Sequence, residues 1–290
     1  MPERSSVLLV GCGHMGRALV AGWCRAGDGA AEIRIVEPDP AQAALVAQAY
    51  PVTVGADLAG AGVGVGVGAG AGVGAGVGVD GARAADIIVF AVKPQAMAAI
   101  VPLYAPLATP DRVFLSIAAG RTIAFLERQL GPAAAVVRAM PNMPAQLHRG
   151  ITVACANARV SARQRALAQT LLAAVGAVEW VEDEALLDPV TAVSGSGPAY
   201  VFLLAECLAE AGVKAGLPPA LAERLARETV AGAGALLERS AEPAATLRAQ
   251  VTSPGGTTAA ALAVLDGPHG LRMLMADAVA AAAARSRELA

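Results

Sequence analysis

Short apolar runs alternate with segments of helical spacing from the start of the chain to about residue 181. The first run, Val7–Val10, ends at a glycine, which is typical of a buried parallel strand. Apolar residues then recur at helical spacing as far as Ala26, and Gly27 supplies a stop. After the second run, Asp39 and Pro40 form a good N-cap and first-turn pair for a helix to about residue 50. The predicted strands are 7–10, 33–36, 86–92, 112–117, 135–140, 151–155 and 178–181.

Because these strands alternate with helices, the pattern predicts right-handed crossovers and a parallel, doubly wound sheet. The character changes near residue 182, and from residue 186 onward alanine-rich helical patterns dominate. The predicted fold class is therefore α/β, with an N-terminal Rossmann-type doubly wound sheet in residues 1–181 and an all-α domain in residues 182–290. The helices expected in the second domain are 198–213, 218–239, 257–265 and 270–287.

The all-α domain is expected to be a dimerisation domain. Its many small side chains allow close helix packing, but a region of this length builds only a thin core of its own. Pairing of the same helices in a second copy would bury the remaining apolar surface. We therefore predict a homodimer formed through the C-terminal helices.

A low-complexity insert lies at about residues 58–79, where the chain is uncharged for the length of a membrane span. Glycine occupies every even position from Gly60 to Gly78, alternating with alanine or valine. Half of these residues have no side chain to offer to lipid, and ordering them costs much backbone entropy. We expect a flexible insert here, not a membrane-spanning helix.

Composition and charge narrow the possible partners. The formal net charge is −2, and no basic run offers a footprint for nucleic acid. The cysteines are scattered without a CxxC pair, which argues against a disulfide framework and against a metal site. No charged leader with an apolar core precedes the first strand, so a cytoplasmic protein without a membrane anchor is expected. The four cysteines are Cys12, Cys24, Cys155 and Cys207.

A glycine-rich loop joins the first predicted strand to the first predicted helix. Gly11 permits a tight turn, Gly13 lets the backbone approach a pyrophosphate, and Gly16 lets the helix pack closely on the strand. The start of the helix offers free N–H groups and a positive dipole end to phosphate. The strand before the loop and the amphipathic helix after it make this a strong dinucleotide signature. His14 and Met15, within the loop, are expected to lie beside the cofactor and not to act as a catalytic base.

Glu37, at the end of the second predicted strand, bears on the choice of cofactor. A carboxylate there accepts hydrogen bonds from the adenine-ribose hydroxyls and repels a 2′-phosphate. No arginine follows immediately to hold such a phosphate. The residue favours NAD over NADP, although a solvent-exposed glutamate before a turn is an open alternative.

Three later strands end in small or special residues, at the edge where ligands bind in open α/β sheets. Together these strand ends predict a continuous cofactor groove. A surface lysine, or prolines that merely shape a loop, would account for some of the same residues. The candidates for cofactor contact are Ala91, Val92, Lys93 and Pro94, then Ala118, Ala119 and Gly120, and finally Asn142.

Two loops in the helical region combine glycine with hydroxyl residues at a predicted helix start. They are Ser194–Tyr200, with hydroxyls at capping positions and proline in the first turn, and Ser253–Thr258. Such a loop presents several N–H groups in one direction, which suits a small carboxylate. A purely structural role is equally compatible with each loop taken alone.

Taken together, these motifs resemble the pyrroline-5-carboxylate reductase family. The resemblance runs through GCGHMG, AVKP, SIAAG, RAMPNMP, VSGSGPAY and SPGGTT in that order, and the last two are specific to the family. It implies a Rossmann domain and a helical domain that interlocks with a partner subunit, which in the family is often part of a larger ring of dimers. It also implies reduction of the cyclic imine 1-pyrroline-5-carboxylate to L-proline with NADPH or NADH.

The resemblance also assigns a substrate loop and a catalytic candidate. Its backbone donors would bind the substrate carboxylate, and the hydroxyl of Thr258 would lie beside the ring nitrogen. A cyclic imine needs little more from side chains, because its protonated form accepts hydride readily once it is placed next to the donor. The implied loop residues are Ser253, Gly255, Gly256, Thr257 and Thr258.

Two departures from the family pattern stand out. Met143 occupies a position where the family usually has threonine, so contacts from that hydroxyl are not assumed. The glycine insert replaces a region that commonly carries an asparagine touching the adenosine.

Two rival functions share part of this pattern. A β-hydroxyacid dehydrogenase resembles this chain in its two-domain plan, but such enzymes pair a lysine with an asparagine four residues later. Here Lys214 is followed by Pro218. A non-catalytic NAD(P)-sensing protein would keep the glycine loop but would not need SPGGTT.

Overall fold

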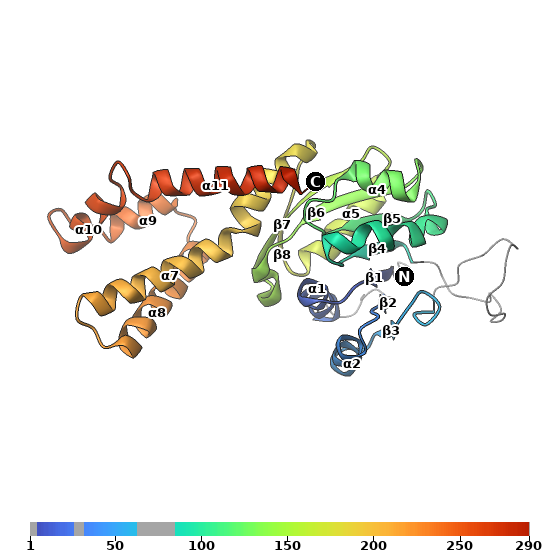
Figure 1. Ribbon diagram of the computed structural model, residues 1–290, viewed down its shortest axis with the longest axis horizontal. Helices are drawn as coiled ribbons and strands as arrows, with labels where there is room; N and C mark the ends of the chain where they lie inside the picture. Colours follow the sequence, from blue (N-terminus) through green and yellow to red (C-terminus); the bar gives the residue numbers. More distant parts are fainter. Residues whose placement is uncertain (1–4, 26–31, 63–84, 290) are drawn as a thin grey trace, which may run out of the picture. The chain divides into compact units, whose positions relative to one another are not determined.

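The computed structural model describes residues 5–25, 32–62 and 85–289 (Figure 1). It divides into two compact units: residues 1–195 with 284–290 form the sheet unit, and residues 196–283 form the helical unit. The last strand ends at Trp180. Residues 182–195 nevertheless pack with the sheet unit. The domain boundary at 181/182 therefore stays a prediction.

Eight strands form one sheet in the order β3-β2-β1-β4-β5-β6-β7-β8. Strand order runs outward from β1 in both directions, which confirms the doubly wound prediction. The short strand β3 was not predicted, because three residues are too few to show an alternating pattern. The strands are β1 (Ser6–Val10), β2 (Glu32–Val36), β3 (Thr53–Gly55), β4 (Ile87–Phe90), β5 (Val113–Ser116), β6 (Ala135–Met140), β7 (Gly150–Ala156) and β8 (Gly176–Trp180).

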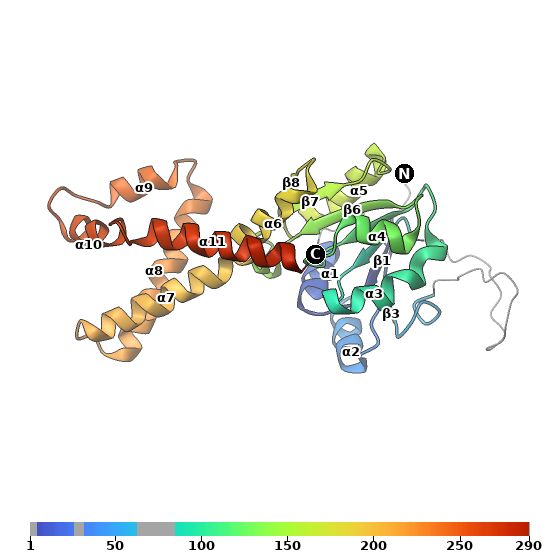
Figure 2. The same ribbon diagram turned by 45° about the horizontal axis from the view of Figure 1, so that its top comes forward.

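Helices cover both faces of this sheet, as Figures 1 and 2 show. One buried cluster joins the sheet to α1, α2 and α5, and a second joins its other face to α3, α4 and α6. The strands in the middle are buried on both faces, which is why they read as continuous apolar runs in the sequence. The helical elements of this unit are α1 (His14–Arg25), α2 (Pro40–Ala49), α3 (Met97–Ile100), α4 (Ile123–Leu130), α5 (Ala162–Ala173) and α6 (Leu187–Val190), with 3₁₀ turns at Pro94–Ala96, Val101–Leu107, Met143–Leu147 and Glu184–Leu186.

The expectation of a fully parallel sheet was wrong at one place. Strands β6 and β7 pair antiparallel, whereas the other six strand pairs among the described residues are parallel. The segment between them, residues 141–149, holds only a 3₁₀ turn. A parallel return needs a dozen or more residues to cross the sheet, so this short connection makes β7 run back beside β6.

The helical unit contains four of the expected helices and one that was missed. Helices α7 (Gly197–Lys214) and α8 (Pro219–Arg239) pack closely, with Ala222 and Ala226 buried at their contact. Helix α9 (Ala244–Gln250) was not predicted, because its seven residues show no clear apolar stripe. Helices α10 (Thr257–Leu265) and α11 (Leu271–Glu288) have the expected bounds to within a residue, and the last residues of α11 belong to the sheet unit.

The segment Ser194–Tyr200 is not a loop before a helix, as the sequence suggested. Thr191–Gly195 is a π-helical turn that leads directly into α7. Ser194 Oγ donates a hydrogen bond to the carbonyl of Val190 at 3.0 Å, and Ser196 makes no side-chain cap. Pro198 lies in the first turn of α7, where a backbone N–H has no intrahelical acceptor, so the proline costs the helix no hydrogen bond.

Much apolar surface is exposed in this part of the chain. The helical run Glu184–Lys214 is long and apolar enough to cross a membrane by length and composition alone. An 18-residue stretch within it has a mean hydropathy of 1.3, and only 6% of that stretch is buried. Large side chains such as Phe202 and Leu203 are more than half exposed. In the insert noted above, residues 58–62 form turns, and residues 63–79 lie outside the described residues.

Candidate functional site

The glycine loop between β1 and α1 is shaped by close backbone contacts. Gly11 has φ +84°, and a Cβ there would lie 2.6 Å from Cγ1 of Val92. A Cβ on Gly16 would lie 2.7 Å from the carbonyl oxygen of Gly11. No atom lies within 4 Å of the corresponding position on Gly13. The first two positions therefore require glycine for packing, while Gly13 leaves open space in front of the first turn of α1.

A cavity of about 780 Å³ lies against this loop. It is lined by the ends of β1, β2 and β4, by the turn 56–59, and by residues of α3 and the 3₁₀ turn after it. Its size is within the range of small-molecule sites. A cradle without side chains at the mouth of such a cavity fits the pyrophosphate and adenosine of a dinucleotide. The sequence-predicted residues that line it are Gly11, Gly13, Glu37, Ala91, Val92 and Lys93.

Glu37 is buried and not a solvent-exposed side chain, since only 9% of it is accessible. One carboxylate oxygen accepts a hydrogen bond from the backbone N–H of Cys12 at 2.7 Å. The other accepts from the N–H of Asp39 at 3.0 Å. Glu37 thus links the glycine loop to the start of α2, where Asp39 caps the helix.

The cavity wall near Glu37 is acidic. Asp57 also lines it, and its side chain accepts from the N–H of Gly60 at 2.7 Å. Along the sequence no lysine or arginine occurs between Arg34 and Arg83. Lys93, which is exposed, is the one cationic side chain among the residues that line this cavity.

Cys12 is fully buried beside these groups. Burial, and to a lesser extent the negative charge of Glu37, raise the pKa of the Cys12 thiol to about 12. The thiol therefore stays protonated at neutral pH, which agrees with a small packing residue.

The two neighbouring strand-end loops are connected to each other. Arg121 Nε donates a hydrogen bond to the carbonyl of Pro94 at 2.9 Å. In the loop after β5, the hydroxyl of Ser116 accepts from the N–H of Ala118 at 3.2 Å, and Gly120 has φ +69°. The AVKP and SIAAG segments, both expected to touch cofactor, thus form one connected edge. Ala118, Ala119, Gly120 and Pro94 are not among the residues that line the 780 Å³ cavity.

A second, smaller cavity of about 420 Å³ lies at the start of α1 and the end of β6. His14 and Met15 line it, together with Asn142 and Met143. The side chain of Asn142 is oriented by a backbone group of β7, because its Oδ1 accepts a hydrogen bond from the N–H of Ile151 at 2.9 Å. Met143 is half exposed, and its thioether offers no hydroxyl at the position where the family usually has threonine. Some of the predicted cofactor residues therefore line the larger cavity and others line the smaller one, while Gly16, Pro94 and Ala118–Gly120 line neither.

The candidate substrate loop belongs to the helical unit. Gly255 has φ +68°, and a Cβ on Gly256 would lie 2.6 Å from the hydroxyl oxygen of Ser253. Gly256 is the N-cap of α10, and Thr257 and Thr258 begin the helix. The N–H groups of a first helical turn have no intrahelical acceptor. The loop therefore offers a compact set of donors, with the half-buried Thr258 in that first turn.

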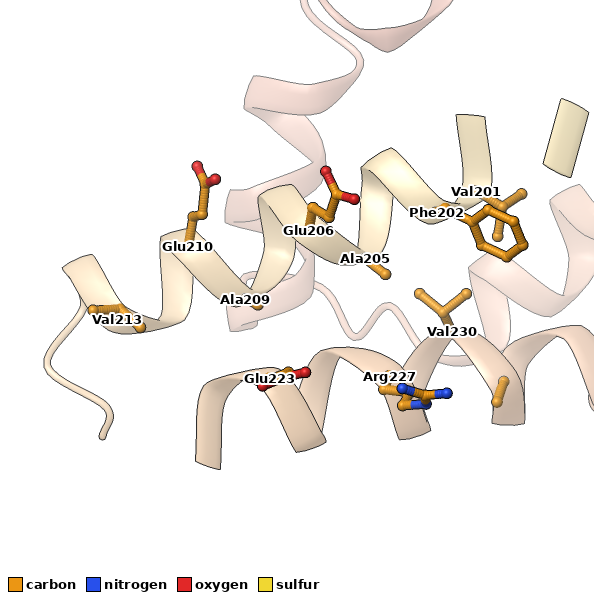
Figure 3. Close-up of a pocket in the computed structure, with 11 residues that line it drawn as sticks. Val201, Phe202, Ala205, Glu206, Ala209, Glu210, Val213, Glu223, Arg227 and Val230 are labelled. Atoms are coloured by element: carbon orange, nitrogen blue, oxygen red, sulfur yellow. The ribbon is translucent and has the colours of Figure 1, made fainter. Parts of the chain in front are cut away.

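A groove of about 690 Å³ runs between α7 and α8 (Figure 3). Apolar side chains such as Phe202 and Val230 lie at one end of it, with Arg227 and the acidic Glu206 and Glu223 along its length. An exposed groove of this kind, beside large uncovered apolar side chains, is typical of an interaction surface.

Sequence reasoning missed one wall of the larger cavity. Ala96 lines it from the 3₁₀ turn before α3, Ile100 from α3 itself, and Leu103 and Tyr104 from the 3₁₀ turn that follows. The segment carries two prolines, Pro102 and Pro106, which obscured its helical spacing. A usable signal was its apolar character directly after AVKP. Among the described residues, no three His, Cys, Asp or Glu side chains come together as a metal site would require.

Because its pKa is raised to about 12 and its side chain is buried, Cys12 is expected to stay unmodified when the folded protein meets iodoacetamide. A pH of about 8 suits the test, since an ordinary thiol is then partly ionised. Peptide mass spectrometry would follow Cys12 in folded and denatured protein, and labelling is expected only after denaturation. Rapid labelling of Cys12 in the folded state would contradict this account.

Comparison with known proteins adds evidence along almost the whole chain. The family model described as pyrroline-5-carboxylate reductase dimerisation matches residues 184–289. The model described as NADP oxidoreductase, coenzyme F420-dependent, matches residues 6–120. The pyrroline-5-carboxylate reductase of Pseudomonas aeruginosa is 41% identical over 284 residues, which cover 98% of this chain and 96% of that protein.

Solved structures give the same result. A pyrroline-5-carboxylate reductase from Coxiella burnetii superposes with a TM-score of 0.85 at 33% identity, and 99% of each chain is covered. The Plasmodium falciparum pyrroline carboxylate reductase with NADP bound gives a TM-score of 0.76 at 27% identity, covering 99% of this chain and 98% of that one. The chain belongs to the pyrroline-5-carboxylate reductase family.

Proposed function

We propose that this protein reduces 1-pyrroline-5-carboxylate to L-proline with a nicotinamide cofactor held along the carboxyl edge of the sheet. The main support is that the two matching family models, over residues 6–120 and 184–289, include both the glycine loop and the loop Ser253–Thr258. Family membership favours this function over a β-hydroxyacid dehydrogenase and over a non-catalytic sensor. We also expect a cytoplasmic protein, since reducing compartments keep thiols free and the four cysteines are unpaired.

The reaction mainly requires that the protein hold the nicotinamide next to the carbon of the imine. When bound, the reduced nicotinamide supplies a hydride, which the carbon of a protonated cyclic imine accepts. The first turn of α1 holds the pyrophosphate, and Glu37 accepts hydrogen bonds from ribose hydroxyls. In the helical unit, the N–H groups at the start of α10 bind the substrate carboxylate. The protonated ring nitrogen donates a hydrogen bond to the hydroxyl oxygen of Thr258, which keeps that proton in place.

The direct test is oxidation of NADH or NADPH, followed by absorbance, with 1-pyrroline-5-carboxylate as substrate. Turnover with L-proline as product is expected. Oxidation of 3-hydroxy acids with NAD⁺ but no turnover of the imine would favour the dehydrogenase. Tight cofactor binding with no turnover of either substrate would favour the sensor.

The acidic wall around Glu37 leads us to propose that NADH is preferred over NADPH, unlike the Plasmodium falciparum relative that was solved with NADP. Replacing Glu37 with serine removes a buried carboxylate that would face the 2′-phosphate. The ratio of kcat/KM for NADH to that for NADPH is expected to fall about tenfold, a free-energy change of about 1.4 kcal/mol. Glu182→Ser, whose side chain is 89% exposed, is the matched control. A wild-type preference for NADPH would contradict the proposal.

Thr258→Ala tests the catalytic assignment. Loss of the hydroxyl bonded to a charged ring nitrogen is expected to lower kcat/KM for the imine about tenfold or more, while the Kd for NADH stays unchanged. The control Thr170→Ala removes a hydroxyl that only bonds the carbonyl of Ala166 within α5. Equal turnover of wild type and Thr258→Ala would remove Thr258 from the mechanism.

We further propose that the groove between α7 and α8 receives a helix of a second copy. Phe202 is 54% exposed in the single chain, and burying its ring would contribute about 2 kcal/mol to association. Phe202→Ala is therefore expected to weaken the dimer by more than tenfold, measured by light scattering on dilution. Leu45→Ala on α2, where the side chain is 52% exposed, is the control. A mass of more than two chains in the same measurement would indicate the larger ring, and a monomeric wild type would contradict the proposal.

A further inference from the structure

The loop that follows β5 is contacted by a segment far away in the sequence. Gly120 lies in the left-handed region with φ +69°, and a Cβ on it would lie 2.7 Å from the carbonyl oxygen of Leu289. The backbone just after α11 therefore packs directly against Gly120. Both residues belong to the sheet unit, as do residues 284–288 at the end of α11.

The end of α11 is fixed by one partly buried hydrogen bond. Ser286 is only 5% exposed, and its hydroxyl donates to Oδ1 of Asp188 at 2.7 Å. Asp188 lies in the first turn of α6, where the neighbouring Leu187 is fully buried in the core. A charged acceptor makes this bond stronger than one between neutral groups. Leu289 thus contacts Gly120 from a helix end that this hydrogen bond holds in place.

The same segment before α7 also holds the other end of the loop. Glu184 Oε1 accepts a hydrogen bond from the N–H of Ile123, the first residue of α4, at 2.8 Å. That oxygen also accepts from Nη1 of the buried Arg138 at 2.8 Å. The short stretch that carries Glu184 and Asp188 therefore contacts both ends of the loop. Glu184 binds the start of α4 directly, and Asp188 acts through the end of α11.

We propose that Ser286 and Asp188 are positioning residues for cofactor binding. Their hydrogen bond keeps the end of α11 against Gly120, and so keeps the Ala118–Gly120 loop in the shape that receives the cofactor. The proposal rests on the function proposed above, because it takes this loop as a cofactor contact. A loop that is already ordered loses less conformational entropy on binding, so the cofactor binds more tightly. Arg121 follows this loop and donates a hydrogen bond to the carbonyl of Pro94, so an ordered loop also restrains the AVKP segment.

The test compares Ser286→Ala with Ser240→Ala, a serine at the end of α8 whose hydroxyl accepts only from the nearby N–H of Glu242. Three quantities are measured on the full chain: the Kd for NADH by fluorescence, the steady-state constants with the imine, and hydrogen exchange of residues 114–122 without cofactor. For Ser286→Ala, the Kd and KM for NADH are expected to rise about fivefold, as for loss of one hydrogen bond. The kcat and the KM for the imine are expected to stay within about twofold, and exchange in the loop to speed up.

A second pair of variants separates the hydrogen bond from mere packing. Asp188→Asn keeps an oxygen that accepts from Ser286 and is expected to bind NADH nearly as well as wild type. Asp188→Ala loses the acceptor and is expected to match Ser286→Ala. The double variant Ser286→Ala with Asp188→Ala is expected to bind NADH no more weakly than either single variant, because the two residues act as a pair.

Two outcomes would overturn the proposal. One is unchanged loop exchange in Ser286→Ala, which would show that the end of α11 does not order the loop. The other is faster exchange with an unchanged Kd for NADH, which would show that loop order does not matter to the cofactor. If wild type binds NADH but does not reduce the imine, the proposed function fails, while exchange and Kd still decide the role of Ser286.

Discussion

The cofactor side of the sheet unit depends on the close approach of Gly11, Gly16 and the residues that follow β4. With no side chain at the first two positions, the first turn of α1 lies directly on the loop, and the loop lies directly on Val92. Any Cβ would push these backbones apart by a large fraction of an ångström. This contact brings the N–H end of α1 to the point where strand order reverses on either side of β1, which is where open α/β sheets bind ligands.

Glu37 is one buried carboxylate with a structural role, and the proposed cofactor preference rests on its charge. Its bonds to the N–H groups of Cys12 and Asp39 tie the glycine loop to the start of α2. The same negative charge raises the pKa of Cys12 and makes the wall of the cavity unfavourable for a second anion. Asp57 on that wall, and Lys93 as the one cation lining the cavity, are the further observations that support the proposed preference for NADH.

The helical unit is built on a different principle. Its alanines let α7 and α8 pack closely, but the larger apolar side chains remain uncovered in a single chain. The match to a dimerisation family model over residues 184–289 accounts for this exposed apolar surface as one that a second copy covers. The membrane-like hydropathy of Glu184–Lys214 follows from the same apolar residues, which a second copy can bury as well as lipid can.

Much was determined by the sequence alone. The apolar runs and the spacing of Gly11, Gly13 and Gly16 predicted the doubly wound sheet and the dinucleotide loop, and the ordered motifs predicted the family correctly. These are local signals, because strand burial, tight turns and helix starts depend on neighbouring residues. Only the tertiary structure decided that β7 runs antiparallel, that Glu37 is buried against Cys12, and that Leu289 contacts Gly120. Such contacts join residues far apart in the chain, and no periodicity of a single segment records which distant backbone it will meet.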